Sequence, residues 1–257
     1  MCVKKILEWF GGKPPVPVTG DLVDVSLVIN DYAGSANDLN GCERDQENAE
    51  KTLKTYWPFK VYKFKNSEVT RKLFKEQLTL ALQQKWDTVI LFMDCCFSED
   101  NTRALSIRTR FVPPEKPIKK IRKHIGRSPE MKWIAFSACQ DFQTAADAYI
   151  GGAYNGAFTY FAMKALKPGM TYKDWYEVTK VLLRDNGFEQ IPEIQGPDEL
   201  LNKRVFSDKT LFFQYSGHGT PVQDKNGDEA DGQDEALYLY DGVLLDDELH
   251  EILTTIS

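Results

Sequence analysis

The sequence has little of what marks a disulfide-stapled, zinc-binding or membrane-spanning protein. Its five cysteines are an odd number in 257 residues, and no two are spaced as CxxC, so neither a disulfide framework nor a zinc site is expected. No stretch approaches the ~20 apolar residues of a membrane span. The first 20 residues hold only a short, interrupted apolar patch, unlike a signal peptide. We therefore expect a soluble protein of the reducing cytoplasm.

The chain also lacks an excess of positive charge. Its 32 Lys and Arg stand against 38 Asp and Glu, for a net charge of -6, so no general attraction to nucleic acid or anionic membranes is expected. Hydrophobic residues make up 42% of the chain, which is enough to build a core. The length suits one large α/β domain or two small ones.

Strand and helix patterns alternate along the chain. Continuous or alternating apolar runs predict strands, and apolar positions at helical spacing predict helices. Strands are expected at 25–30, 60–64, 88–93, 133–137 and 210–215, and helices at 45–56, 67–84, 157–166 and 246–254. This order predicts an α/β fold with a mainly parallel central sheet sandwiched between helices.

Three segments depart from this pattern. Residues 1–20 predict a short N-terminal helix and a Pro/Gly linker. Residues 103–127 carry nine Lys and Arg, one acid and three prolines, which predicts an exposed basic loop. Residues 224–251 carry eleven acids and one lysine. Either charged run alone is as consistent with a solvated surface as with a functional one.

Two buried strands end in residues that could do chemistry. Residues 88–93 run into Asp94-Cys95-Cys96, and residues 210–215 run into Ser216-Gly217-His218-Gly219. Parallel sheets place functional groups at the carboxyl ends of their strands. A thiol and an imidazole at neighbouring strand ends would form a nucleophile and its base. An isolated SGHG is more often a tight turn, and the second loaded strand end is what favours the catalytic interpretation.

The spacing does not choose between the two adjacent thiols. Neighbouring residues of an extended segment point to opposite faces, so only one of Cys95 and Cys96 can face His218, and the other would pack in the core. The N–H of Gly219 could stabilise an oxyanion together with the N–H of the nucleophile.

Four segments together resemble the metacaspases and related bacterial caspase-like cysteine proteases. They are the opening strand and helix SLVINDYAGSANDLNGCERDQENAEKTL, the cysteine block VILFMDCCFSED, the small-subunit region FSACQDFQTAADAYIGGAYNGAFTYFAMKAL and the histidine block LFFQYSGHGTPVQDKNGDEADGQDEALYLYD. The resemblance implies a single caspase-like domain over residues 21–257. Its blocks would span 86–101 for the cysteine block, 102–128 for the basic loop, 129–206 for the small-subunit-like region and 207–257 for the histidine block.

The resemblance assigns the catalytic pair to Cys96 and His218, with Cys95 where the family often has serine. Phe97 and Glu99 depart from the His and Gly usual in the family, and neither position belongs to the pair. The histidine block comes last here, whereas it precedes the cysteine block in the family. Active-site geometry does not depend on chain order, so a rearranged single domain is feasible.

By the same resemblance, Asp45 and Asp94 line the pocket for the residue before the cleaved bond, with Ser216 and Cys42 beside them. Two carboxylates favour a guanidinium or ammonium group, so cleavage after Arg or Lys, and not after Asp, is expected. Position alone makes Asp45 equally an ordinary acid in the first turn of a helix, and for Cys42 a structural role is preferred.

No cofactor is required, but the acidic run raises the question of calcium. An EF-hand is not expected, because Glu229 stands where the loop needs glycine and a strand precedes the loop. Many metacaspases use another calcium site, and the matching acids here are Asp100, Asp234, Asp246 and Asp247. Acid-rich turns are also common without metal.

The expected function is thus a cysteine endopeptidase acting on proteins or peptides with Arg or Lys before the cleaved bond. Caspase relatives are cut between the cysteine block and the small-subunit strand, so self-processing within 103–127 is also expected. Two alternatives remain open from the sequence. One is a catalytically inactive caspase-like scaffold module, and the other is a calcium-responsive regulatory domain.

Overall fold

The computed structural model describes residues 15–96, 107–113, 131–140, 143–223 and 233–256. The predicted N-terminal helix, most of the basic loop and part of the acidic run therefore lie outside the described residues. Residues 15–20, in the predicted linker, form no helix or strand. No helix of the described part is long and apolar enough to cross a membrane.

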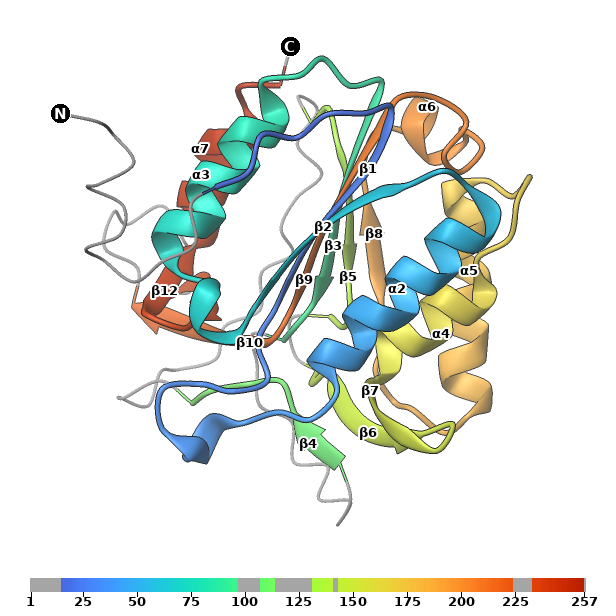
Figure 1. Ribbon diagram of the computed structural model, residues 1–257. Helices are drawn as coiled ribbons and strands as arrows, with labels where there is room; N and C mark the ends of the chain where they lie inside the picture. The colour runs from blue at the N-terminus through green and yellow to red at the C-terminus, as the bar shows by residue number, and fades with distance from the viewer. Residues whose placement is uncertain (1–14, 97–106, 114–130, 141–142, 224–232, 257) are drawn as a thin grey trace, which may run out of the picture.

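A six-stranded sheet forms the centre of the fold (Figure 1), in the order β2-β1-β9-β3-β5-β8. Every neighbouring pair is parallel except β5 and β8, which confirms the predicted mainly parallel α/β fold. Its strands are β1 (Leu22–Val28), β2 (Lys60–Lys65), β3 (Thr88–Asp94), β5 (Ile134–Ser137), β8 (Glu193–Gln195) and β9 (Thr210–Ser216).

Helices cover both faces of this sheet, as Figure 1 shows. One face carries α3 (Arg71–Leu82) and α7 (Asp246–Leu253), and the other carries α2 (Cys42–Tyr56), α4 (Ala157–Ala165) and α5 (Tyr172–Asp185). The short helices are η1 (Ser35–Asn37), η2 (Asn66–Glu68) and α6 (Asp198–Leu201). The spacing placed the start of α2 at residue 45, three residues late, because helical apolar periodicity does not mark the capping turn at Gly41.

Strand β9 shows why the central strands read as continuous apolar runs. Phe213 and Tyr215 face the core under α3, whereas Phe212 faces the core under α4 and α5. Successive side chains of a strand point to opposite faces of the sheet, and both faces are covered here. All seven residues of β9 and of β3 are consequently buried.

The topology brings together the carboxyl ends of β3 and β9, which are followed by the candidate thiols and imidazole. Strand β9, from the last fifth of the chain, lies between β1 and β3. Its register places Ser216 opposite Asp94 of β3. The segments that follow β3 and β9 therefore emerge side by side at the carboxyl edge of the sheet.

Two small antiparallel sheets complete the fold. One pairs β10 (His218–Gln223) with β11 (Gln233–Leu239) and β12 (Gly242–Leu245). The other has β6 (Ala146–Ile150) between β4 (Ile107–Thr109) and the hairpin strand β7 (Ala153–Gly156). Figure 1 shows the second sheet below the central one, at the end to which the parallel strands run.

Phe212 should be one of the most costly positions to truncate. Its ring lies 5.3 Å from that of Phe92 and 6.3 Å from that of Trp175, centroid to centroid, and all three residues are fully buried. In a Cys96→Ala background, Phe212→Ala should lower the free energy of unfolding by about 3–5 kcal/mol, because a cavity is left. Denaturant unfolding measures this. Tyr149→Ala is the control, since Tyr149 is 62% exposed; equal losses for both variants would contradict the described core.

Candidate active site

The two strand ends meet through a direct backbone contact. Gly217, which follows β9, donates its N–H to the carbonyl of Asp94, the last residue of β3, at 3.3 Å. Cys95 and Cys96 follow Asp94, and His218 follows Gly217. The thiols and the imidazole thus come from adjacent positions on one edge, as the strand-end argument predicts.

The two adjacent thiols point to opposite sides of the sheet. Cys95 packs in the core under α3, and Cys96 packs in the core on the other side together with Cys139. Burial raises the pKa of Cys95 well above its usual value, so its thiol stays neutral. Cys139 forms a side-chain hydrogen bond with Cys96, which together with burial raises the pKa of Cys139. The N–H of Cys96 contacts the carbonyl of Arg110, which connects this residue to the groups described next.

His218 is held in one tautomer by its surroundings. Its Nε2 lies 2.8 Å from the carbonyl oxygen of Asn37, which can only accept, so Nε2 carries the proton and Nδ1 the lone pair. Nδ1 is buried and has no hydrogen-bond partner among the described residues. Burial lowers the pKa of His218 to about 4, although the carbonyls of Asn37 and Arg110 oppose this. The imidazole is therefore neutral at pH 7 and can accept a proton.

One carbonyl oxygen occupies the space between Cys96 and the histidine strand. The oxygen of Arg110 accepts hydrogen bonds from the N–H of Cys96, at 3.3 Å, and from the N–H of Gly219, at 3.1 Å. These are the two amides that the sequence argument assigned to an oxyanion. They converge on a single acceptor, which is the geometry that stabilises a tetrahedral intermediate.

The side chain of the same residue fills an acidic pocket. The guanidinium of Arg110 contacts carboxylates of Asp45 at 2.7 Å, Asp94 at 3.2 Å and Asp147 at 3.2 Å. It also donates to Ser216 Oγ at 2.5 Å, and that hydroxyl donates to Asp45 at 2.6 Å. All four side chains of this ion-pair cluster are fully buried. Asp45, Asp94 and Ser216 thus lie together, as predicted, with a cation between them.

Backbone groups and glycines fit the walls of the pocket to these charges. Asp94 accepts from the N–H and the hydroxyl of Thr159, at 3.0 and 2.5 Å, and Asp45 accepts from the N–H of Gly156 at 2.9 Å. A Cβ atom on Gly156 would collide with Asp94 and Arg110, and one on Gly41 would collide with Asp147. Only glycine lets the backbone come this close.

The charges of the pocket perturb one another. Burial raises the pKa of Asp45 to about 7; Arg110 opposes this rise, and the charge of Asp94 adds to it. Burial disfavours the charge of Arg110, but Asp45 and Asp94 outweigh it and raise the arginine pKa still further. The pocket therefore favours a cation, because its buried carboxylates would otherwise repel one another.

Residues 107–112 bind along this site as an extended strand. β4 pairs antiparallel with β6, with Arg108 opposite Asp147. Arg110 then donates its N–H to the carbonyl of Ala145 at 3.0 Å, and Val112 donates to the carbonyl of Gly219 at 3.0 Å. Main-chain hydrogen bonds thus hold the segment on both sides of the Arg110–Phe111 peptide bond.

The prediction of an exposed loop at 103–127 is wrong for this segment. Arg110 is completely buried and Phe111 is 8% exposed. Proline and like-charge density predict solvent exposure locally, but the partners of Arg110 lie 65 and 16 residues earlier and 37 residues later in the chain. Local sequence patterns cannot predict ion-pair partners that are this distant in the chain.

The other predicted residues fall into two groups. Cys42 is fully buried beside Arg110 and Ser216, and burial raises the pKa of its thiol, which suits the preferred structural role. His250, on α7, is exposed. Phe97, Glu99, Asp100 and His124 lie outside the described residues.

The calcium prediction stays a prediction. Asp234 and Asp247 lie near enough to Asp246 for their charges to act on it, and burial with these charges raises the pKa of Asp246 to about 6. Asp246 Oδ1 is buried without a hydrogen-bond partner in the described structure, which is compatible with a cation there. Within the described ranges, however, no group of three or more Asp, Glu, His or Cys side chains is arranged to hold a metal ion.

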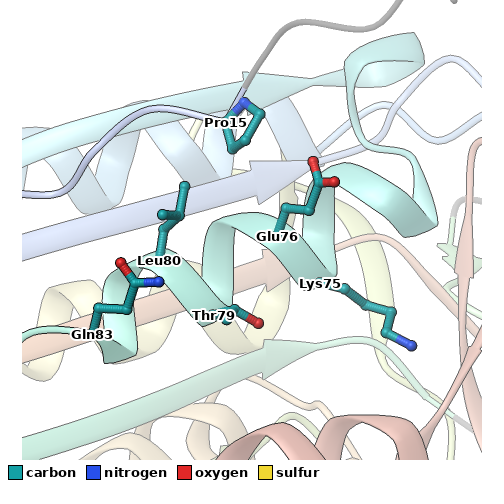
Figure 2. Close-up of a pocket in the computed structure, with 6 residues that line it drawn as sticks. All are labelled: Pro15, Lys75, Glu76, Thr79, Leu80 and Gln83. Carbon is teal, nitrogen blue, oxygen red and sulfur yellow. The ribbon is translucent and has the colours of Figure 1, made fainter. Parts of the chain in front are cut away.

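A separate groove lies on the outer side of α3, where the chain passes at Pro15 (Figure 2). It is lined by Pro15, Lys75, Glu76, Thr79, Leu80 and Gln83. None of these is a predicted site residue, and the groove contains no nucleophilic thiol or imidazole. The acidic pocket at the carboxyl edge, already filled by Arg110, remains the candidate active site.

Sequence reasoning missed four residues of this site. Arg110 was grouped with an exposed loop, and Asp147, Asn37 and Tyr32 were not singled out. Tyr32 accepts the N–H of His218 at 2.7 Å, and its ring lies 4.9 Å from the imidazole. An acid within the apolar β6 segment was the one available signal, because a charge there needs a buried partner.

Two family models match the chain. One, described as "Caspase domain", matches residues 61–199, which is more than half of the chain. The other, described as "Metacaspase, peptidase C14 domain", matches residues 193–257.

Curated relatives match shorter stretches. Metacaspase-1 of Schizosaccharomyces pombe is 53% identical over 47 residues, which are 17% of this chain and 11% of the relative. Metacaspase-1 of Candida glabrata is 33% identical over 104 residues, 39% of this chain and 25% of the relative. Metacaspase-1 of Ajellomyces capsulatus is 50% identical over 48 residues, which are 17% of this chain and 14% of the relative. The chain thus covers a quarter or less of the length of these three relatives.

The depressed pKa of His218 should appear as a pH-dependent loss of stability. The unfolded imidazole binds a proton below its pKa of ~6.5, whereas the native one does so only near pH 4. The contribution is therefore complete above pH 6.5 and is lost as pH falls, by about 2 kcal/mol at pH 5. In a Cys96→Ala background, denaturant unfolding at pH 7.5 and 5 should show this extra loss relative to His218→Gln. Parallel pH curves for the two proteins would contradict the buried neutral imidazole.

Proposed function

This chain belongs to the caspase-domain family of peptidases, and from its site we propose that it is a cysteine endopeptidase that cleaves after arginine or lysine. The observation that carries the proposal is the position of Arg110. Its side chain occupies the acidic pocket while its carbonyl oxygen accepts from Cys96 and Gly219. A substrate residue before the cleaved bond needs both contacts at once.

The pocket chemistry supports a basic residue over an acidic one. A planar guanidinium can donate to several carboxylates at once, and an ammonium can replace it as a point charge. An aspartate in the same place would bring a further negative charge into a buried group of three acids. Arginine should therefore be preferred to lysine, and aspartate should be rejected.

The acylation step follows from the atoms around the Arg110 carbonyl. In this proposal Nδ1 of His218 takes the proton from Cys96 Sγ, and the thiolate attacks the carbonyl carbon of the basic residue. The N–H groups of Cys96 and Gly219 stabilise the oxyanion. Nδ1 then returns the proton to the departing amine, and a thioester remains on Cys96. Throughout, the Asn37 carbonyl keeps the other proton on Nε2.

Deacylation uses the same groups with water as the nucleophile. Nδ1 takes a proton from water, the hydroxide attacks the thioester carbonyl, and the thiolate leaves as the C–S bond breaks. The proton on Nδ1 then returns to the sulfur. No cofactor takes part. The reaction requires a free thiol, and the four described cysteines are all free, which supports the proposed location in the reducing cytoplasm.

Self-processing is part of the proposal, and the contacts of residues 108–112 indicate which peptide bond would be cleaved. Residues 108–112 lie in the cleft as a substrate would, so the Arg110–Phe111 bond is the one presented to Cys96. Until that bond is cut, the segment excludes other substrates from the pocket. The first turnover would thus be on the chain itself.

The specificity prediction is tested with fluorogenic peptides that end in Arg, Lys or Asp before the reporter group. We expect hydrolysis in the order Arg, then Lys, with no measurable cleavage after Asp. Asp45→Asn should lower kcat/KM for the Arg peptide roughly 100-fold, because a buried charge pair is broken. Calcium and chelator arms of the same assay test the calcium prediction, which expects chelation to lower the rate.

Two controls accompany this assay. Asp185→Asn, at an exposed site, should leave the rates unchanged, and Cys96→Ala should abolish them. Cleavage after Asp would overturn the specificity. Inactivity towards every peptide, in the self-cleaved protein or in Arg110→Ala where no self-cleavage occurs, would favour the scaffold alternative. Calcium-dependent stability without peptidase activity would favour the regulatory domain.

Self-cleavage is tested by intact mass measurement during incubation. The wild-type chain should yield a new C-terminus at Arg110 and a new N-terminus at Phe111, and Cys96→Ala should remain uncut. Arg110→Lys should retain the cut at a lower rate, since lysine keeps the charge but not the planar fork. A Cys96→Ala chain cut at the same bond and rate would show that another protease is responsible.

A further inference from the structure

The segment of residues 37–40 contacts the base, the bound strand and the pocket wall together. The carbonyl of Asn37 accepts from His218 Nε2 at 2.8 Å. The next carbonyl, that of Asp38, accepts from the guanidinium of Arg108 at 2.6 Å. Asn40 donates its N–H to Asp147 at 2.8 Å. Arg108 stands two residues before Arg110, so it represents the substrate residue two positions before the one in the pocket.

Asp38 connects the two peptide groups that make the contacts with His218 and Arg108. The carbonyls of Asn37 and Asp38 belong to consecutive rigid peptide planes that share only the Asp38 Cα atom. The carboxylate of Asp38 accepts from the N–H of Tyr32 at 3.1 Å, and Leu39 donates to the carbonyl of Asn30 at 2.9 Å. Only the φ and ψ rotations of Asp38 separate the two planes, and these two hydrogen bonds limit those rotations. A side chain that holds the Asp38 carbonyl therefore also restrains the plane that carries the Asn37 carbonyl.

The strand register exposes alternate substrate residues to this segment. Arg108 lies opposite Asp147 in the β4–β6 ladder, and Arg108 and Arg110 share a face because strand side chains alternate. Thr109, between them, points to the other face. The side chain at position 108 thus lies on the same face of the bound segment as the side chain in the pocket.

We infer that residues 37–40 couple a basic residue, two positions before the residue in the pocket, to the orientation of His218. Substrates of the form Arg-x-Arg are then turned over faster, and not only bound more tightly. The inference rests on the proposed peptidase function. Asp38 is a positioning residue in this account, since it acts through the Asn37 carbonyl and not on the reacting atoms.

The required substrate group is a side-chain donor with positive charge. Its acceptor is a backbone carbonyl, and the carboxylates of Asp38 and Asp147 lie in the same region. A glutamine is shorter and uncharged, and a glutamate would be repelled. When this donor is missing, the Asn37 carbonyl is less firmly held, and the imidazole can lose the tautomer that leaves Nδ1 free to act as base.

The effect on chemistry can be separated from binding in the chain itself. Arg108 is exposed, so Arg108→Gln should fold, and Arg110 still anchors the segment in the pocket. Because this cleavage is intramolecular, its first-order rate constant measures the reaction and not the encounter. We expect Arg108→Gln to slow the appearance of the Phe111 N-terminus about fivefold to tenfold, as loss of one solvent-exposed hydrogen bond predicts. Arg108→Lys should retain most of the rate.

Arg184→Gln is the matched control, because Arg184 is an exposed arginine on α5 that pairs with its neighbour Asp185. It should self-cleave at the wild-type rate. An Arg108→Gln chain that self-cleaves as fast as wild type would overturn the inference. If wild type itself never self-cleaves, the peptide assay decides.

The peptides are Ile-Arg-Thr-Arg and Ile-Gln-Thr-Arg, each with a fluorogenic leaving group, added after self-cleavage or, without it, to Arg110→Ala. We expect kcat to fall about fivefold to tenfold for the Gln peptide, and Asp38→Ala to remove most of that difference. A change confined to KM, or no change, would overturn the coupling while leaving the peptidase function intact. If neither peptide is cleaved, the proposed function itself fails.

Discussion

The buried ion-pair cluster around Arg110 determines how the carboxyl edge of the sheet is arranged. Its three carboxylates come from α2, β3 and β6, three elements far apart in sequence, and one guanidinium holds them together. Ions this deeply buried are tolerated only when they are paired and hydrogen-bonded. Ser216, Thr159 and the Gly156 N–H supply further hydrogen bonds.

In the proposed mechanism, the same cluster links substrate specificity to the catalytic groups. The residue that satisfies the pocket charges also presents its carbonyl to Cys96 and Gly219, so recognition of the side chain and alignment of the reacting bond are one event. The pocket is not stable as an empty set of charges, and the pKa of Asp45, raised by burial to about 7, means that a proton can partly replace an absent cation. In the uncut chain, Arg110 itself supplies the cation that neutralises these carboxylates.

The sequence predicted the parts of this site that depend on local pattern or on resemblance. The apolar runs gave β3 and β9, whose ends carry Cys96 and His218, and the block resemblance gave Asp45, Asp94 and Ser216. Arg110 and Asp147 could not be predicted in the same way. Their burial depends on charges 16 to 65 residues away, whereas composition reports only on neighbours. The role of the Asn37 carbonyl could not be predicted either, because any residue type supplies a backbone acceptor.

The central claim is that Cys96 is an activated thiol beside a pocket that selects arginine. It is tested most directly with two peptidyl ketone probes, one ending in Arg and one in Asp, added to the self-cleaved protein, or to Arg110→Ala if no self-cleavage occurs, and mapped by mass spectrometry. The account predicts rapid modification of Cys96 by the Arg probe, with Cys95, Cys42 and Cys139 unmodified and the Asp probe unreactive. Modification of Cys95 in place of Cys96, or equal reaction of both probes, would contradict it.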